Sequence, residues 1–285
     1  MIHPAVISVI VFATLGAPHL RAQPQPAPPL AFEVASVKPN TSSDLRGMGL
    51  RSSPGGRFVA TGVPLLILVA TAYHLPFQSE RISGGPPWIR SERFDIEAKA
   101  PDGALPASDT SDVRDQKMRL MLQSLLADRF KLTIRRETKE LPVYSLVVGK
   151  NGPKLKAAAI EEKDCPEGPV DNGVSCHSFF GGQGRGLHGK AVNMADLVLY
   201  VSNWTDRPTI DKTGLQGLYD IQTDGWSPMR PRPGPPGEGP EAVAMADPTT
   251  PTLFLVLDKL GLKLQPEKGL IEMFVIEHVE RPSEN

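Results

Sequence analysis

The two halves of this sequence carry the same short phrases in the same order, and this repetition constrains the fold more than any other feature. Matching phrases lie 125 residues apart at the pair Phe94 and Tyr219, and 132 residues apart at the pair Arg129 and Gly261. Only short gaps are needed to align the halves, so we predict an internal duplication. Chance similarity between two stretches of mixed structure is the alternative. The matching phrases are Gly56-Arg57-Phe58 with Gly186-Leu187, Phe94-Asp95-Ile96 with Tyr219-Asp220-Ile221, and Arg129-Phe130-Lys131-Leu132 with Gly261-Leu262-Lys263-Leu264.

Hydrophobic periodicity predicts the same order of elements in each half, namely strand-helix-strand-strand-helix-strand-strand. The clearest helix is Asp112–Asp128, where apolar residues recur on one face at helical spacing. At the end of the first half, Lys131–Arg136 and Val143–Gly149 are expected to pair as a hairpin through Glu137–Pro142. The expected fold is therefore α+β, with two similar units that arose by duplication.

Composition shifts predict the boundaries of these units. The first α+β unit is expected at residues 31–155 and the second at residues 186–282, with a connector at residues 156–185 between them. A Pro/Gly-rich insertion at residues 227–251 interrupts the second unit where the first has a shorter polar loop.

The N-terminus has the pattern of a secretory signal. Residues 1–22 contain a short apolar core and a small residue at the expected cleavage point, and residues 23–30 form a Pro-rich leader. The apolar core is shorter than a bilayer span, so we expect a secreted or periplasmic protein that does not span the membrane after signal cleavage. A retained N-terminal membrane anchor is the alternative.

The two cysteines, Cys165 and Cys176, stand eleven positions apart. In an oxidising compartment such a pair forms a disulfide that closes a short loop. A metal site built from Cys165, Cys176 and His177 is the competing interpretation. It lacks a fourth ligand at a recognisable spacing, so we favour the disulfide and expect no metal.

Charge and motifs exclude several classes of function. The formal net charge of -1 argues against a nucleic-acid partner. Gly184–Gly189 matches the dinucleotide pattern G-x-G-x-x-G but stands before a predicted strand and not before a helix, so we expect no cofactor. Nucleophile and zinc-protease motifs are absent from the sequence. Whether the protein is an enzyme stays open, with the balance towards a non-catalytic role.

Tryptophans beside arginines near predicted turns are candidate binding residues, because aromatic and guanidinium groups together recognise carbohydrates and proteins. The alternative is that each indole covers the edge of a small core. The turn at Asp211–Leu215 contributes further candidates, since Lys212 and Thr213 could hold an anion there, although a purely structural turn explains the same residues. The candidates are Trp88, Arg90, Trp204, Arg207, Asp211, Lys212 and Thr213.

Several phrases resemble a soil-associated bacterial family of uncharacterised secreted proteins. They include Phe32–Asn40, Phe94–Lys99, Leu125–Leu132 and Arg207–Leu215, and the resemblance extends from Phe32 to Pro282. The resemblance implies a domain of unknown function that is sometimes fused to membrane metalloproteases of the antibiotic-sensor type, and we expect no such fusion for this protein. Each half is also loosely similar to the short β-α-β modules of secretins and TonB-dependent receptors, which bind partner proteins.

Taken together, these features favour an exported, non-catalytic binding or protein-interaction module at the cell envelope. Its expected partner is an envelope protein or a polysaccharide. The alternative function is a hydrolase that acts on an extracellular polymer, with its site between the two lobes. An enzyme should show an inter-lobe pocket with convergent titratable groups, whereas a binding module should show an exposed sheet edge or apolar patch.

Overall fold

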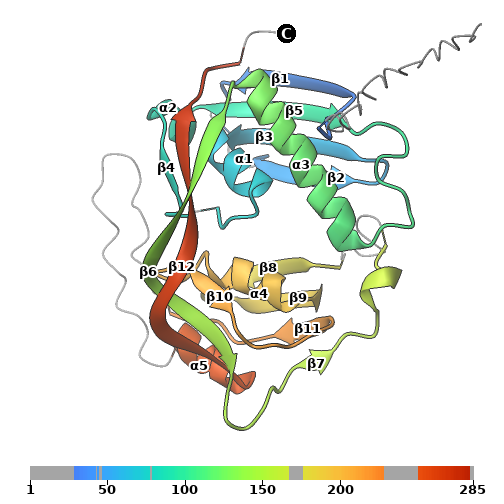
Figure 1. The fold of residues 1–285 in the computed structure, drawn as a ribbon. Coiled ribbons are helices and arrows are strands. Elements are labelled where there is room, and N and C mark those ends of the chain that lie inside the picture. The colour runs from blue at the N-terminus through green and yellow to red at the C-terminus, as the bar shows by residue number, and fades with distance from the viewer. Residues whose placement is uncertain are drawn as a thin grey trace, which may run out of the picture.

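The computed structural model describes residues 29–42, 44, 47–77, 79–166, 176–227 and 250–282. These residues form two lobes, each with a four-stranded sheet, and a third sheet runs alongside both (Figure 1). The mixed α+β class is as predicted. The predicted signal peptide, nearly all of the Pro-rich leader and nearly all of the 227–251 insertion lie outside the described residues.

The first lobe is an antiparallel sheet covered by helices. Its strand order is β1-β5-β3-β2, and the longest helix of the lobe, α3, lies along the sheet (Figure 1). Burial of apolar side chains from the sheet and from α1 and α3 forms one hydrophobic core. The bounds are β1 Val34–Asn40, β2 Gly49–Ser53, β3 Arg57–Pro64, α1 Leu65–Ala72, α2 Trp88–Ser91, β5 Arg93–Lys99 and α3 Ser111–Arg129.

The second lobe repeats this layout with shorter elements. Its sheet also has four strands, in the order β7-β11-β9-β8. Two helices, α4 and α5, contribute to its separate core. The bounds are β7 Lys156–Ala157, the 3-10 helix η1 Glu162–Asp164, β8 Ser178–Gly182, β9 Gly186–Val192, α4 Met194–Val201, β11 Tyr219–Gln222 and α5 Leu253–Lys259.

Local sequence explains where α4 begins. The Asn193 side chain accepts a hydrogen bond from the Asp196 N–H at 2.9 Å, and the Asp196 carboxylate accepts one from the Asn193 N–H at 2.9 Å. This reciprocal capping box satisfies two backbone donors that the first turn of a helix leaves free. Asn193 is therefore the N-cap of α4.

The third sheet joins the lobes. Strands β6 (Thr133–Val148) and β12 (Leu262–His278) pair antiparallel along almost their whole length, and Figure 1 shows them running from one lobe to the other. Short parallel strands flank the pair: β10 (Thr209–Asp211) adds to β6, and β4 (Ile82–Gly84) adds to β12. Each long strand thus pairs with a short strand from the other half of the sequence.

The predicted hairpin through Glu137–Pro142 is wrong, because β6 continues through it as one strand. The same holds for β12, where two closing strands were expected. Pro142 and Pro266 fit in these strands because Tyr144, the partner of Pro266, donates its N–H away from β12, to Pro208 O at 2.8 Å. Pro266 is paired with Tyr144, and two residues further along the ladder Lys268 is paired with Pro142. Both are therefore non-hydrogen-bonded pairs, so neither proline removes a hydrogen bond between the strands.

The long strands also exchange core residues between the lobes. Phe274 and Ile276, near the end of β12, are buried in the core of the first lobe. Tyr144 and Leu146, near the end of β6, are buried in the core of the second lobe. Each lobe therefore completes its core with side chains from the opposite half of the sequence.

Asp95 and Asp220 stabilise a backbone irregularity at the same place in each lobe. Asp95 accepts a hydrogen bond from the Gly62 N–H at 2.7 Å, and Asp220 accepts one from the Ala191 N–H at 3.2 Å. Gly62 and Ala191 both have positive φ angles, of 60° and 43°. Both aspartates are therefore cross-strand partners, which satisfy a donor freed by the local shift in register.

Three short strands were not predicted. Strand β2 lies in a polar segment of the first half, and β7 and β8 lie in the stretch predicted as the connector at residues 156–185. All three are edge strands, whose outer side has no partner strand within the described residues. Pairing with a single neighbour leaves little alternation of apolar residues to detect.

Candidate functional site

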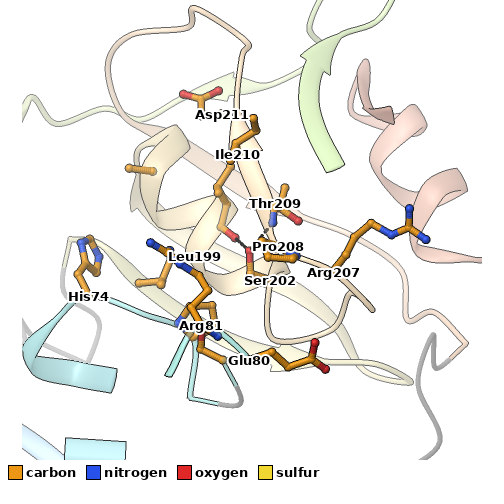
Figure 2. Close-up of a pocket in the computed structure, with 14 residues that line it drawn as sticks. His74, Glu80, Arg81, Leu199, Ser202, Arg207, Pro208, Thr209, Ile210 and Asp211 are labelled. Carbon is orange, nitrogen blue, oxygen red and sulfur yellow. Dashed lines mark hydrogen bonds between the residues drawn. The ribbon is translucent and has the colours of Figure 1, made fainter. Parts of the chain in front are cut away.

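A pocket of about 320 Å³ lies between the two lobes. Residues of the first half, from His74 to Arg81, form one wall, and residues of α4 and β10 form the other (Figure 2). The walls are largely apolar, because helix α4 turns Leu197 and Val201 into its own core and leaves Val198 and Leu199 to line the pocket. An apolar cavity with a few polar groups is the usual form of a small-molecule site.

Arg81 places a positive charge in this pocket. Its Nε donates to the Glu272 backbone oxygen at 2.9 Å, and its guanidinium lies 5.6 Å from the centre of the Phe274 ring. Burial lowers the pKa of Arg81 and the nearby Glu272 carboxylate raises it, but arginine stays charged in proteins. Among the described residues, the two terminal nitrogens of Arg81 have no hydrogen-bond partner. They are available to a ligand, and Figure 2 shows Arg81 between His74 and Ser202.

His74 lies at the edge of the pocket (Figure 2). Desolvation by the surrounding protein and the nearby Arg119 charge lower the pKa of His74, which favours a neutral ring. His74 therefore does not supply a second positive charge beside Arg81 at neutral pH.

Ser202 and Thr209 are engaged in the structure of the pocket wall. Ser202 Oγ donates to the Val198 backbone oxygen at 2.7 Å and accepts from the Thr209 N–H at 3.3 Å. These bonds attach β10 to the last turn of α4. The Ser202 hydroxyl therefore serves as a structural contact and is not activated by a neighbouring base among the described residues.

Of the seven predicted binding residues, Arg207 and Asp211 line the pocket. The Arg207 guanidinium nevertheless turns away from it, as Figure 2 shows. It lies 4.7 Å from the centre of the Tyr144 ring and 3.1 Å from the Asp206 carboxylate. Arg207 thus contributes its backbone to the pocket wall and its charge to the protein surface.

The predicted tryptophan-arginine pairs are not assembled into one surface. The Trp88 ring lies 5.1 Å from the guanidinium of Arg281, and Arg90 is exposed. The Trp204 ring packs edge-on against Trp226 at 5.9 Å, on the margin of the second core. These contacts agree with the alternative in which an indole covers the edge of a core.

The Asp211–Leu215 turn has the structure that its sequence predicts. Asp211 Oδ1 accepts hydrogen bonds from the backbone N–H and from the hydroxyl of Thr213, both at 2.8 Å. Gly214 has a φ of 67°, which costs glycine little. The ammonium of Lys212 lies 2.5 Å from the Glu267 carboxylate, so its charge is paired within the protein.

Replacing Asp211 with alanine should therefore lower thermal stability. Loss of two partly exposed hydrogen bonds should cost about 1 kcal/mol, which corresponds to a fall of roughly 2–4 °C in a protein of this size. Calorimetry measures the shift. Asp102→Ala is the matched control, because Asp102 has a 92% exposed side chain that pairs with Lys99. Equal melting temperatures for Asp211→Ala and the native protein would contradict the structural role of the turn.

A second cluster of polar groups lies beside the pocket. A hollow of about 410 Å³ shares His74 and Ala195 with the pocket and is also lined by Asp112 and Asp196. Next to these two carboxylates lies His177, whose side chain is only 7% exposed.

Carboxylates from three different elements surround the His177 ring. Nδ1 lies 2.6 Å from Asp196 Oδ2 on α4, and Nε2 lies 2.9 Å from Glu162 Oε2 on η1 and 3.8 Å from Asp112 Oδ1 on α3. Burial opposes protonation, but the hydrogen bond to Asp196 and the three negative charges outweigh it and raise the pKa of His177 to about 9. Burial also raises the pKa of Asp112.

The sequence alone did not indicate this cluster. Its one readable signal was the pair Asn193 and Asp196, whose spacing is that of a capping box. The disulfide between Cys165 and Cys176, which is confirmed, brings the other parts together. It ties the residue before His177 to the segment just after Glu162.

The fold and the site define a mixed α+β protein with two lobes and a ligand-sized pocket between them. Residues 67–279 match the family model described as "Protein of unknown function (DUF3738)", and the chain belongs to this family. The match agrees with the expected domain of unknown function, while soil association, secretion and fusion to proteases stay predictions. No curated protein and no solved structure matched the chain. Across the described residues, no helix combines the length and the apolar character needed to cross a bilayer.

Proposed function

We propose that this protein is an exported binding module that holds a small ligand between its two lobes. The observation that carries the proposal is the inter-lobe pocket, which combines apolar walls with the unsatisfied guanidinium nitrogens of Arg81. An apolar cavity favours an apolar ligand body, and a guanidinium recognises carboxylate, sulfonate or phosphate groups through paired hydrogen bonds. The ligand class is therefore an apolar molecule with one anionic group.

A binding role has more support than hydrolysis of an extracellular polymer. The hydroxyl of Ser202 is engaged with backbone groups, and the structure gives no contact between a nucleophile and a base among the described residues of the pocket. His74 has a lowered pKa but no hydrogen-bonded carboxylate to orient its ring among those residues. An envelope protein or polysaccharide as a further partner stays a prediction.

Export and duplication belong to the same proposal. The Cys165–Cys176 disulfide supports an oxidising compartment, as does the signal-like N-terminal sequence. The matching strand orders of the two lobes support descent of the halves from one duplicated unit. The Asp95 and Asp220 contacts at equivalent bulges support it further.

Binding of 1-anilinonaphthalene-8-sulfonate tests the proposal, since this probe joins aromatic rings to one sulfonate. We expect saturable fluorescence enhancement with the native protein, and a roughly ten- to hundredfold weaker affinity for Arg81→Ala, because a hydrogen-bonded charge is worth about 1.5–3 kcal/mol. Arg81→Lys keeps the positive charge but loses the paired donors of the guanidinium. Its affinity for the probe should lie between those of the native protein and of Arg81→Ala.

Arg90→Ala is the matched control, because Arg90 is exposed and does not line the pocket. It should bind the probe like the native protein. Thermal melting of every variant, measured in parallel, separates loss of binding from loss of folding. Equal affinity of the native protein and a folded Arg81→Ala variant would exclude the pocket as the binding site.

A further inference from the structure

The cluster around His177 has the geometry of a metal site. Two carboxylate oxygens lie near His177 Nε2, namely Glu162 Oε2 at 2.9 Å and Asp112 Oδ1 at 3.8 Å. The Nε2 atom is buried and makes no directional hydrogen bond with any described residue, although Glu162 Oε2 is only 2.9 Å away. A close contact that lies off the ring N–H axis is typical of two ligands that share an ion, since metal bonds of about 2.0–2.2 Å place neighbouring ligands roughly 3 Å apart.

The second atom of each ligand group is held by another part of the protein. His177 Nδ1 lies 2.6 Å from Asp196 Oδ2, Glu162 Oε1 accepts from the Asp112 N–H at 3.2 Å, and Asp112 Oδ2 accepts from Asn193 Nδ2 at 3.5 Å. A carboxylate on one imidazole nitrogen orients the ring and leaves the other nitrogen for a metal. Each of the three groups therefore has its second polar atom engaged elsewhere, and both carboxylates keep one oxygen near His177 Nε2.

We propose that His177, Glu162 and Asp112 bind one divalent transition-metal ion, for which zinc is the best match. One imidazole and two carboxylates suit zinc, and the partial exposure of Glu162 and Asp112, 30% and 56% of their side chains, leaves a path for the ion and room for water ligands. Three carboxylates around one imidazole also concentrate negative charge that a dication neutralises.

Cys165 is not one of these ligands. Its sulfur lies within 4.8 Å of the Glu162 and His177 ligand atoms, but the disulfide with Cys176 removes the thiolate that zinc requires. From the sequence, a metal site built from the two cysteines and His177 was the less favoured interpretation, because it lacked a fourth ligand. The structure supplies the carboxylates and leaves the cysteines bonded to each other.

The ion would connect the two lobes. Asp112 lies in the first turn of α3 in the first lobe, while Glu162 on η1 and His177 just before β8 belong to the second lobe. Metal binding to the folded protein should therefore stabilise the contact of α3 with the second lobe.

Calorimetric titration of zinc chloride into the full chain tests the proposal, with the disulfide intact and prior metal removed by a chelator. We expect one ion per chain and a rise of several degrees in melting temperature. Glu162→Gln and Asp112→Asn should each weaken zinc binding at least about tenfold. Glu161→Gln is the matched control, because Glu161 is an exposed neighbour paired with Lys163, and it should bind zinc like the native protein.

Three results would overturn the proposal. The first is an absence of zinc binding to the folded native chain. The second is equal binding by folded Glu162→Gln and Asp112→Asn variants, which would place the ion elsewhere. The third is binding that requires reduction of the disulfide, which would assign the ion to Cys165 and Cys176 thiolates. Because both test positions are partly exposed, neither variant removes a core side chain.

Discussion

Replacing Phe274 with alanine should lower the free energy of unfolding by about 3–5 kcal/mol, the range measured for loss of a buried aromatic ring. Phe274 is 2% exposed, and its ring lies 5.1 Å from the ring of Tyr73. The guanidinium groups of Arg81 and Arg136 lie 5.6 and 5.4 Å from its centre. A cavity here would remove contacts from α1, from the pocket arginine and from β6 together.

The expected loss concerns the whole protein, because β12 belongs to both lobes. Phe274 packs in the first core, whereas Leu262 and Leu264 of the same strand pack in the second. Urea denaturation followed by circular dichroism and by tryptophan fluorescence should therefore show a single transition, shifted to lower urea. Leu270→Ala is the matched control on the same strand, because Leu270 is 74% exposed and should change stability little. Two separate transitions, or a loss below about 1 kcal/mol for Phe274→Ala, would contradict a shared core.

Removing the disulfide should have the second largest effect. The double variant Cys165→Ala, Cys176→Ala should lose about 2–3 kcal/mol, which is the chain-entropy value for a closed loop of this length. Cys165 is 6% exposed and packs with Ala191 and Leu218, so the variant also loses some apolar burial. Urea denaturation under oxidising conditions measures the difference from the native protein.

A reductant provides the control for the disulfide. Dithiothreitol should lower the stability of the native protein towards that of the double variant and should leave the variant unchanged. The single variant Met48→Ala changes a residue that is 48% exposed and far from the disulfide in sequence. Dithiothreitol should lower its stability by as much as it lowers that of the native protein. Equal stability of native protein and double variant under oxidising conditions would contradict a stabilising bridge.

Elements with strong local signals were predicted well. Helix α3 differs from its predicted bounds by one residue at each end. A periodic apolar pattern acts within a few residues, so neighbouring side chains carry enough information. The Cys165–Cys176 bridge and the Asp211 turn were readable for the same reason.

The long strands and the site were not predicted, because their contacts join distant parts of the chain. The segment Glu137–Pro142 contains proline and charged residues, which favoured a turn when considered alone. Its partner strand, β12, lies more than a hundred residues later and makes an extended conformation favourable. Arg81 is likewise unremarkable in the sequence, and its position depends on Glu272, which is 191 residues away.

The sequence by itself determined the class of fold, the order of most elements, the disulfide and the turn at Asp211. All of these depend on interactions between residues close together in the chain. Tertiary structure alone decided that β6 and β12 extend through both lobes, that Arg81 faces a pocket between them, and that three carboxylates surround His177. The physical reason is that a short segment has several local conformations of similar energy. Pairing and burial against a distant part of the chain select one of them, and the short segment by itself carries no information about that distant part.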